Sequence, residues 1–139
     1  MRKILLFATL FLSISYLNAQ CVKQKNRHGD ALYYIDVFTL KSKNRHGEAL
    51  YYIDGQTIRK KNRHGDALYY IDGSSVNAKN RFGDAVFYFD GQTIRRKNRF
   101  GDALYYIDGQ TLKYKDRFGD AVYFFEGIPE KWVIICLII

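Results

Sequence analysis

Proline and cysteine are scarce in this chain of 139 residues. The one proline, Pro129, follows the last of the repeated segments described below, so no predicted strand contains a residue without a backbone N–H donor. The two cysteines, Cys21 and Cys136, lie far apart in the sequence. In an oxidising compartment they could form a disulfide. Alternatively, Cys136 is a buried free thiol within the apolar run around it.

Recognisable catalytic groupings are also missing. The sequence has no Ser-His-Asp or Cys-His arrangement and no phosphate-binding glycine loop. Its polar groups recur evenly along the chain, whereas catalysis usually needs an asymmetric cluster of groups. We therefore expect a protein that is not an enzyme and has no cofactor.

What the chain has instead is an 18-residue repeat. The unit is clearest in Lys61-Asn-Arg-His-Gly-Asp-Ala-Leu-Tyr-Tyr-Ile-Asp-Gly73, and related copies begin at Lys25, Lys43, Lys79, Lys97 and Lys115. The spacing is constant, with no insertion between copies. Repetition at a fixed period indicates an architecture of equivalent units.

Each repeat predicts two short strands. The segment Asp-Ala-Leu-Tyr-Tyr-Ile-Asp is rich in aromatic and β-branched residues, which favour a strand. The segment Gln-Thr-Ile-Arg-Lys-Lys predicts a polar strand with one apolar residue. An Asp-Gly turn joins them at one end, and a four-residue loop, Asn-Arg-His-Gly or Asn-Arg-Phe-Gly, joins them at the other.

The strand pairs predict an all-β domain over residues 21–127. Six pairs of a polar and an aromatic strand cover residues 21–36, 37–54, 55–72, 73–90, 91–108 and 109–126. Pairing of residues 21–26 with 120–126 would remove the two free sheet edges. The predicted fold is therefore a closed ring, or shallow barrel, of six β-hairpin repeats with about twelve antiparallel strands, followed by an apolar C-terminal tail.

The loops also predict the register of the strands. The Asp-Gly turn predicts that Tyr51 pairs with Ile58, and the four-residue loop predicts that Ile58 pairs with Tyr69 and Arg59 with Leu68. Because side chains alternate across a strand, two faces follow. The expected core face carries Ile58, Ala67, Tyr69, Ile71 and, in another repeat, Ile107. The opposite face carries Thr57, Arg59, Lys61, Leu68 and Tyr70.

The repeat resembles a known family. The pattern Gly-x-x-x-Tyr-Tyr-Ile-Asp-Gly-x-x-Ile is similar to the repeat of the β-flower families, such as the 4-fold β-flower proteins, over residues 21–127. The resemblance implies hairpin petals around a symmetric barrel, here wider because there are six repeats instead of four. Val37 and Phe38 depart from it, since they replace Gly-Gln in the first turn. β-Flowers are in turn similar to Tubby-like and scramblase-like barrels, which engage lipids, so the resemblance implies a role at lipids.

Residues 1–20 have the pattern of a secretory signal peptide. Arg2 and Lys3 precede an apolar run from Ile4 to Leu17 and a cleavage region before Cys21. We expect an exported protein that is periplasmic, secreted or associated with the cell envelope, with lipidation of Cys21 as an alternative. Removal of the two basic residues lowers the formal net charge from +8 to +6.

The C-terminal tail, residues 128–139, contains the uncharged run Trp132–Ile139. The run is too short to span a bilayer as a helix and too apolar to remain in water. It could plug the barrel, cap one end of it as a strand, or dip into a membrane surface.

Two sets of repeated side chains could carry chemistry. His28, His46 and His64 share one loop position, and three histidines can bind zinc. Because Phe82, Phe100 and Phe118 occupy the same position in the other repeats, we interpret it as an aromatic packing position and expect no metal site. The repeated acids each adjoin a turn, where Asp bonds to the local backbone, so we assign them a structural role.

The function that these features favour is binding of lipid or of a membrane surface, where aromatic and cationic side chains both settle. The candidate binding residues are Tyr34, Tyr52, Tyr70, Tyr88, Tyr106, Arg59, Arg95 and Trp132. The same tyrosines could stack on sugars, so a glycan-binding module is an alternative, and a passive structural envelope protein is another. We expect no nucleic-acid partner, because acids are interleaved with the basic residues and export removes that partner.

Overall fold

The structure, a computed structural model, describes residues 20–139. The predicted signal peptide therefore lies, except for Gln20, outside the described residues. The described chain forms a closed antiparallel barrel in which each strand is hydrogen-bonded to its neighbours in sequence. The strands are β1 (Cys21–Gln24), β2 (Ala31–Asp36), β3 (Thr39–Ser42), β4 (Ala49–Asp54), β5 (Thr57–Lys60), β6 (Ala67–Asp72), β7 (Ser75–Ala78), β8 (Ala85–Asp90), β9 (Thr93–Arg96), β10 (Ala103–Asp108), β11 (Thr111–Tyr114) and β12 (Ala121–Glu126).

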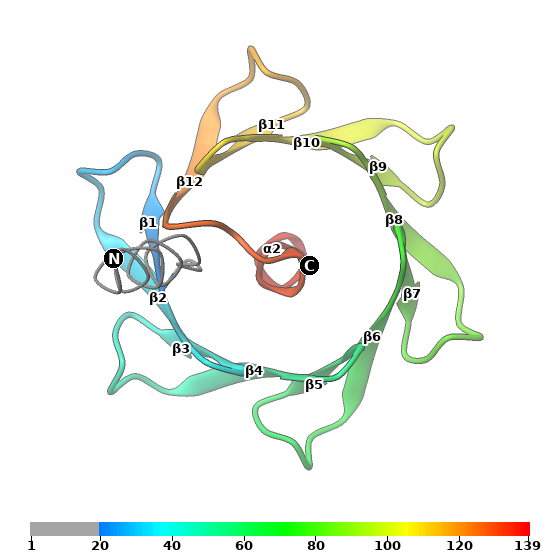
Figure 1. The fold of residues 1–139 in the computed structure, drawn as a ribbon, viewed down its shortest axis with the longest axis horizontal. Helices are drawn as coiled ribbons and strands as arrows, with labels where there is room; N and C mark the ends of the chain where they lie inside the picture. The colour runs from blue at the N-terminus through cyan, green and yellow to red at the C-terminus, as the bar shows by residue number, and fades with distance from the viewer. Residues whose placement is uncertain (1–19) are drawn as a thin grey trace, which may run out of the picture.

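The strands form six hairpins that project outward from a ring (Figure 1). We call these hairpins petals; they are β1–β2, β3–β4, β5–β6, β7–β8, β9–β10 and β11–β12. At their tips are the petal loops, residues 25–30, 43–48, 61–66, 79–84, 97–102 and 115–120. Tight turns join neighbouring petals at the opposite end of the strands, which we call the turn end. The predicted ring of six hairpin repeats is thus confirmed.

The ring closes between β1 and β12, as predicted. Cys21 pairs with Glu126 and Gln24 with Tyr123. Lys23 Nζ lies 2.7 Å from the Glu126 carboxylate. The same pair of positions forms ion pairs elsewhere in the ring, at Lys41–Asp36, Arg59–Asp54, Arg95–Asp90 and Lys113–Asp108. The junction between the two ends of the domain is therefore built like the junctions between consecutive repeats.

The register across the tight turns differs from the prediction by two residues. Ile58 pairs with Ile53, whereas Tyr51 pairs with Lys60. The two central turn residues are Gly55 and Gln56, not Asp54 and Gly55, and Gly55 is the one with a positive φ, +64°. A glycine in the first central position is the requirement of a type II′ hairpin turn. Because the shift is two residues, the predicted faces are unchanged.

A β-bulge in each petal corrects a second part of the predicted register. Ile58 pairs with Tyr69, as predicted, but Arg59 pairs with Ala67 and not with Leu68. Between these two pairs β5 advances by one residue and β6 by two, so Leu68 is the extra residue of the bulge. Ala67 consequently shares the outer face with Arg59, although it was predicted on the core face.

The rest of the predicted core face does line the interior. The apolar residue in each short strand is completely buried, with 0% of its surface exposed: Val22, Leu40, Ile58, Val76, Ile94 and Leu112. The residues paired with them across the tight turns and the seam include Ile35, Ile53, Phe89 and Phe125, which are buried too. Ile71 and Ile107 also pack against this core but are only half-buried.

The C-terminal tail fills the centre of the ring as helix α2 (Lys131–Ile138) (Figure 1). Its buried residues are Trp132, Val133, Ile134, Ile135 and Cys136. Five consecutive residues span more than one helical turn of 3.6 residues, so every side of α2 is in contact with the barrel. Of the three expectations for the tail, the plug is the one the structure shows. Among residues 20–139, no helix is long and apolar enough to cross a membrane.

Helix α2 enters the ring from the turn end. The chain leaves β12 at that end, and Lys131 Nζ donates a hydrogen bond to the carbonyl oxygen of Gly73, in the turn between β6 and β7, at 2.8 Å. The same ammonium group lies 5.0 Å from the centroid of the Phe89 ring. A helix of this length is roughly 12 Å long, so its C-terminus reaches toward the side from which the petals leave.

Val37 is a strained substitute for glycine. Its φ is +56°, and the equivalent Gly55, Gly73, Gly91 and Gly109 have φ between +61° and +64°. A β-branched side chain in this region is an outlier, at a cost of about 1–2 kcal/mol. We predict that Val37→Gly stabilises the protein by about 1 kcal/mol in urea denaturation, after allowance for the entropy of glycine.

The reverse change is the matched control for this prediction. A Cβ atom at Gly55 would have no atom within 4 Å, so Gly55→Val tests backbone strain without a clash. It should destabilise the protein by a similar amount. A stability that is unchanged or lower in Val37→Gly would contradict the assignment of strain.

Candidate functional site

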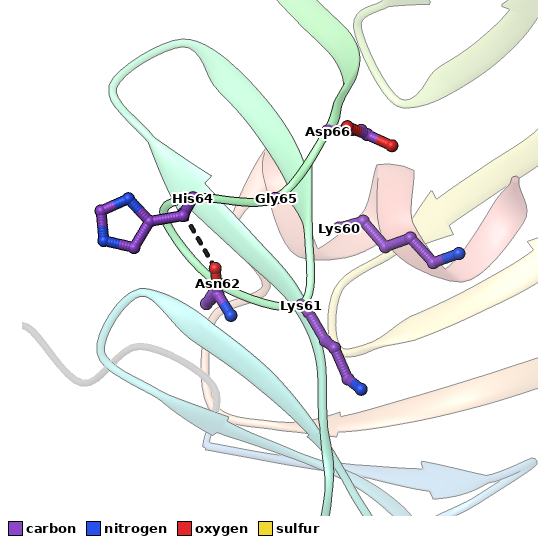
Figure 2. Close-up of a pocket in the computed structure, with 6 residues that line it drawn as sticks. All are labelled: Lys60, Lys61, Asn62, His64, Gly65 and Asp66. Carbon is purple, nitrogen blue, oxygen red and sulfur yellow. Dashed lines mark hydrogen bonds between the residues drawn. The ribbon is translucent and has the colours of Figure 1, made fainter.

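The petal loops have a fixed backbone geometry, shown for the third petal in Figure 2. Lys61 has a φ of +71°. The Asn62 Oδ1 atom accepts a hydrogen bond from the His64 N–H at 2.8 Å, and the Asn62 carbonyl oxygen accepts one from the Gly65 N–H at 2.9 Å. A Cβ atom at Gly65 would lie 1.7 Å from the Lys60 carbonyl oxygen, so only glycine fits there. The loop therefore holds its aromatic residue in one position.

In three petals this geometry presents a phenylalanine to solvent. Phe82, Phe100 and Phe118 each have 83% of their surface exposed. The guanidinium carbon of the preceding arginine lies close to each ring centroid: 4.9 Å for Arg81, 5.1 Å for Arg99 and 5.0 Å for Arg117. The interpretation of this position as a packing position is therefore wrong. The tip of a petal has no facing element to pack against.

The other three petals present a histidine at the same point. Arg45 Nε donates to His46 Nε2 at 3.4 Å, and Arg63 makes the same contact with His64. The arginine and the aromatic ring thus stay neighbours in both kinds of loop. Within residues 20–139, no three His, Cys, Asp or Glu side chains are grouped so that they could hold a metal ion.

Five of the six petal loops contain more basic than acidic residues. Each loop contains one lysine and one arginine and ends in one acid. Lys60 and Arg96 add a further cation just before the third and fifth loops, whereas Asp116 replaces the asparagine of the sixth. Exposed aromatic rings and cations therefore alternate around the rim that the six petals form.

Two open depressions lie beside this rim. A depression of about 380 Å³ is lined by Lys60, Lys61, Asn62, His64, Gly65 and Asp66 (Figure 2). A second of about 670 Å³ lies between the third and fourth petals, lined by Asp66, Ala67, Leu68, Lys79 and Asn80. The side chains of Lys60, Lys61 and His64 point in different directions in Figure 2. They do not converge on a common ligand.

A comparison of the sequence with protein-family models gives a result that agrees with the six repeats and the ring of petals. The model of the 6-fold beta flower protein matches residues 22–136. The chain belongs to the 6-fold beta flower family. The match confirms the resemblance to β-flowers and extends it from four repeats to six. It also covers most of α2, so the central helix is part of the beta flower and not an appendage. Comparison with curated proteins and with solved structures gives no match.

At the centre of the beta flower, α2 ends beside a layer of aromatic side chains. This layer consists of Tyr33, Tyr51, Tyr69, Phe87, Tyr105 and Tyr123, all partly buried against the core. Burial raises the pKa of Tyr51, Tyr105 and Tyr123, so these phenols stay neutral. Ile139 is 40% exposed beyond the helix. The surface around the end of α2 therefore combines neutral aromatic rings with the exposed Ile139. Lys60 and Arg96, which pair with Tyr51 and Phe87, add two cations to the same inner face.

The predicted tyrosines lie on the outer wall of the beta flower. Tyr34, Tyr52, Tyr70, Tyr88 and Tyr106 are half-buried there, and each is paired in register with the residue at the cation position of the next strand. The hydroxyl groups of Tyr70 and Tyr106 donate to Gln56 and Gln92, at 2.6 Å and 2.8 Å. The structure thus brings these tyrosines into one belt.

The other predicted residues have structural contacts. Arg59 Nε lies 3.0 Å from Asp54 Oδ2, and its Nη1 donates to the Gly65 carbonyl oxygen at 3.1 Å. Arg95 makes the equivalent contacts with Asp90 and Gly101. These two arginines connect the loops of the third and fifth petals to the residues that precede the tight turns. Trp132 is only 6% exposed, inside the ring.

Sequence reasoning passed over the phenylalanines that the structure places at the petal tips. A signal for them is present: the position accepts both Phe and His and lies inside a four-residue loop, between an arginine and a glycine. A buried packing position would rarely exchange phenylalanine for a residue with two ring nitrogens that need partners. Exchange of this kind in a loop indicates exposure.

Both thiols are free, so the suggested Cys21–Cys136 disulfide is not formed. Burial raises the pKa of the Cys136 thiol strongly, and burial together with Glu126 raises that of Cys21. Because the thiolate is the reactive form, both cysteines should react more slowly at mildly alkaline pH than a cysteine whose pKa is not raised.

We predict that a maleimide labels Cys136 of the beta flower only after unfolding in guanidinium, while Cys21 is labelled slowly in the native protein. Mass mapping of the labelled peptides measures this. Labelling of Cys136 at equal rates in native and unfolded protein would show that α2 does not stay in the ring, and a disulfide-linked peptide would contradict the free thiols.

Proposed function

We propose that this β-flower is a non-catalytic module that binds the surface of lipid membranes through the rim of its petals. The observation that carries the proposal is the exposure of Phe82, Phe100 and Phe118, each 83% exposed on a rigid loop beside an arginine. Single exposed apolar residues are ordinary on protein surfaces. The same exposed ring at the same point of three neighbouring petals is a repeated feature and suits a shared partner.

The chemistry of the rim fits the boundary between lipid headgroups and acyl chains. A phenylalanine that moves from water into hydrocarbon contributes about 1.5–3 kcal/mol. A basic side chain close to an anionic membrane surface contributes about 1 kcal/mol. Every petal loop supplies one lysine and one arginine that can interact with an anionic membrane surface. The fixed loop backbone keeps the ordering cost of the contact low.

The outer belt of tyrosines supports glycan binding less well. Its rings are half-buried, and the Tyr70 and Tyr106 hydroxyl groups already donate to glutamines of the same barrel. The ring faces on which a sugar would stack are therefore partly covered.

The export of the protein remains part of the proposal, since it would place the rim beside a membrane or envelope surface.

The test is flotation of the purified protein with phosphatidylcholine vesicles that contain or lack phosphatidylglycerol. We expect binding that is stronger to the anionic vesicles and weaker at high salt. The triple variant Phe82→Ser, Phe100→Ser, Phe118→Ser should lose about a thousand-fold or more in affinity if all three rings are buried in the membrane. Its melting temperature should not change, because the rings have no core contacts.

Phe38→Ser is the matched control, because Phe38 is also exposed, 54%, but lies in the first tight turn at the other end of the strands. It should bind as the original protein does. Absence of vesicle binding would sink the proposal. An equal loss in Phe38→Ser would place any binding surface elsewhere, and binding to a glycan array without vesicle binding would favour the glycan-binding alternative.

A further inference from the structure

We propose that the β-flower binds the membrane tilted, with the side of the ring that carries phenylalanine tips inserted and the side that carries histidine tips held away from the acyl chains. This inference rests on the proposed membrane binding and specifies its geometry. It assigns the contact to three adjacent petals instead of the whole rim.

The order of the petals divides the rim into two halves. Strands follow one another around the barrel in sequence order, so the three histidine petals are adjacent and the three phenylalanine petals are adjacent. The histidine half carries His28, His46 and His64, and the phenylalanine half carries Phe82, Phe100 and Phe118. The petals β3–β4 and β9–β10 are three petals apart and lie on opposite sides of the ring (Figure 1). Their loops carry His46 and Phe100.

The petal loops of the two halves have the same backbone conformation, so the two halves differ in the side chain at the tip. The hydrogen bond from the tip N–H to the side-chain oxygen two residues earlier is 2.9 Å at both His46 and Phe100. Glycine N–H donates to the same carbonyl position at 2.8 Å in the second petal and 2.9 Å in the fifth. The loops thus hold His46 and Phe100 equivalently.

The difference in chemistry between the two tips is large in an apolar medium. Transfer of phenylalanine from water to hydrocarbon is favourable, whereas histidine carries two ring nitrogens that both need hydrogen-bond partners. His46 Nε2 has a partner in Arg45 Nε at 3.4 Å. The second nitrogen would need water or a lipid headgroup. Insertion of all six tips into the acyl chains would therefore be favourable for the phenylalanine half of the ring and unfavourable for the histidine half.

A second difference on the inner face points the same way. The last residues of the short strands on the histidine half are Gln24, Ser42 and Lys60, all polar. On the phenylalanine half they are Ala78, Arg96 and Tyr114. Tyr114 is 51% exposed and stacks on Tyr105 with ring centroids 5.6 Å apart. The phenylalanine half thus presents more aromatic surface next to its tips.

Serine substitution at each of the six tips, one at a time, tests the tilt by equilibrium binding to phosphatidylcholine vesicles containing phosphatidylglycerol. Loss of affinity should follow position in the ring. Phe100→Ser, in the middle of its half, should lose about ten-fold or more, and Phe82→Ser and Phe118→Ser somewhat less. His46→Ser, opposite Phe100, should change affinity by about two-fold or less.

The possible results distinguish the hypothesis of tilted binding from the hypothesis of membrane binding itself. Equal losses on the two halves would overturn the tilt and leave membrane binding through the whole rim. Normal vesicle binding with no loss at any tip would overturn the tilt and move the membrane contact away from the rim. Absence of vesicle binding by the unsubstituted protein would remove both. Unchanged melting temperatures of the single variants confirm that each comparison is between folded proteins.

Discussion

The structure depends on the contact between the inner wall of the barrel and α2. A barrel of eight strands can fill its interior with its own side chains, but twelve strands enclose a wider space. The inward residues, such as Ile58 and Leu112, are aliphatic and cannot reach across it. The five buried residues of α2 supply the missing partner, and burial of each large apolar side chain contributes about 1.5–3 kcal/mol. The rigid ring that holds the petals out follows from this contact.

The same contact explains why the tail is helical. Its run of Val133, Ile134 and Ile135 has poor helix propensity, and eight residues are too few for an isolated helix in water. A strand in this place would have no edge to pair with, because the barrel is closed. Its backbone N–H and C=O groups would then be buried without partners. A helix satisfies most of them internally, and Lys131 fixes the helix against Gly73 and Phe89.

The period of the repeat was enough to predict the ring, its strands and the β1–β12 seam, since each follows from counting equivalent units. The details of register were not predictable at that level. The tight turn depends on which residue takes the positive φ, and the bulge at Leu68 leaves no mark in a simple alternation of side chains. The position of the phenylalanine tips was missed because aromatic residues were assumed to pack, although the Phe and His exchange at that position indicates a solvent-facing side chain. The tyrosines and arginines predicted to bind a ligand lie on the outer wall, where Arg59 and Arg95 also pair with Asp54 and Asp90; their role in binding stays a prediction.

The most direct test of the central contact is the unfolding free energy of a protein that ends at Glu130, compared with one that lacks only the exposed Ile139. Removal of residues 131–139 should lower stability by several kcal/mol, as the loss of more than one buried side chain requires, and should expose apolar surface that binds a hydrophobic dye. Removal of Ile139 alone should have little effect. An unfolding free energy that is the same in the two truncated proteins would show that the twelve strands fill their own interior and that α2 is dispensable.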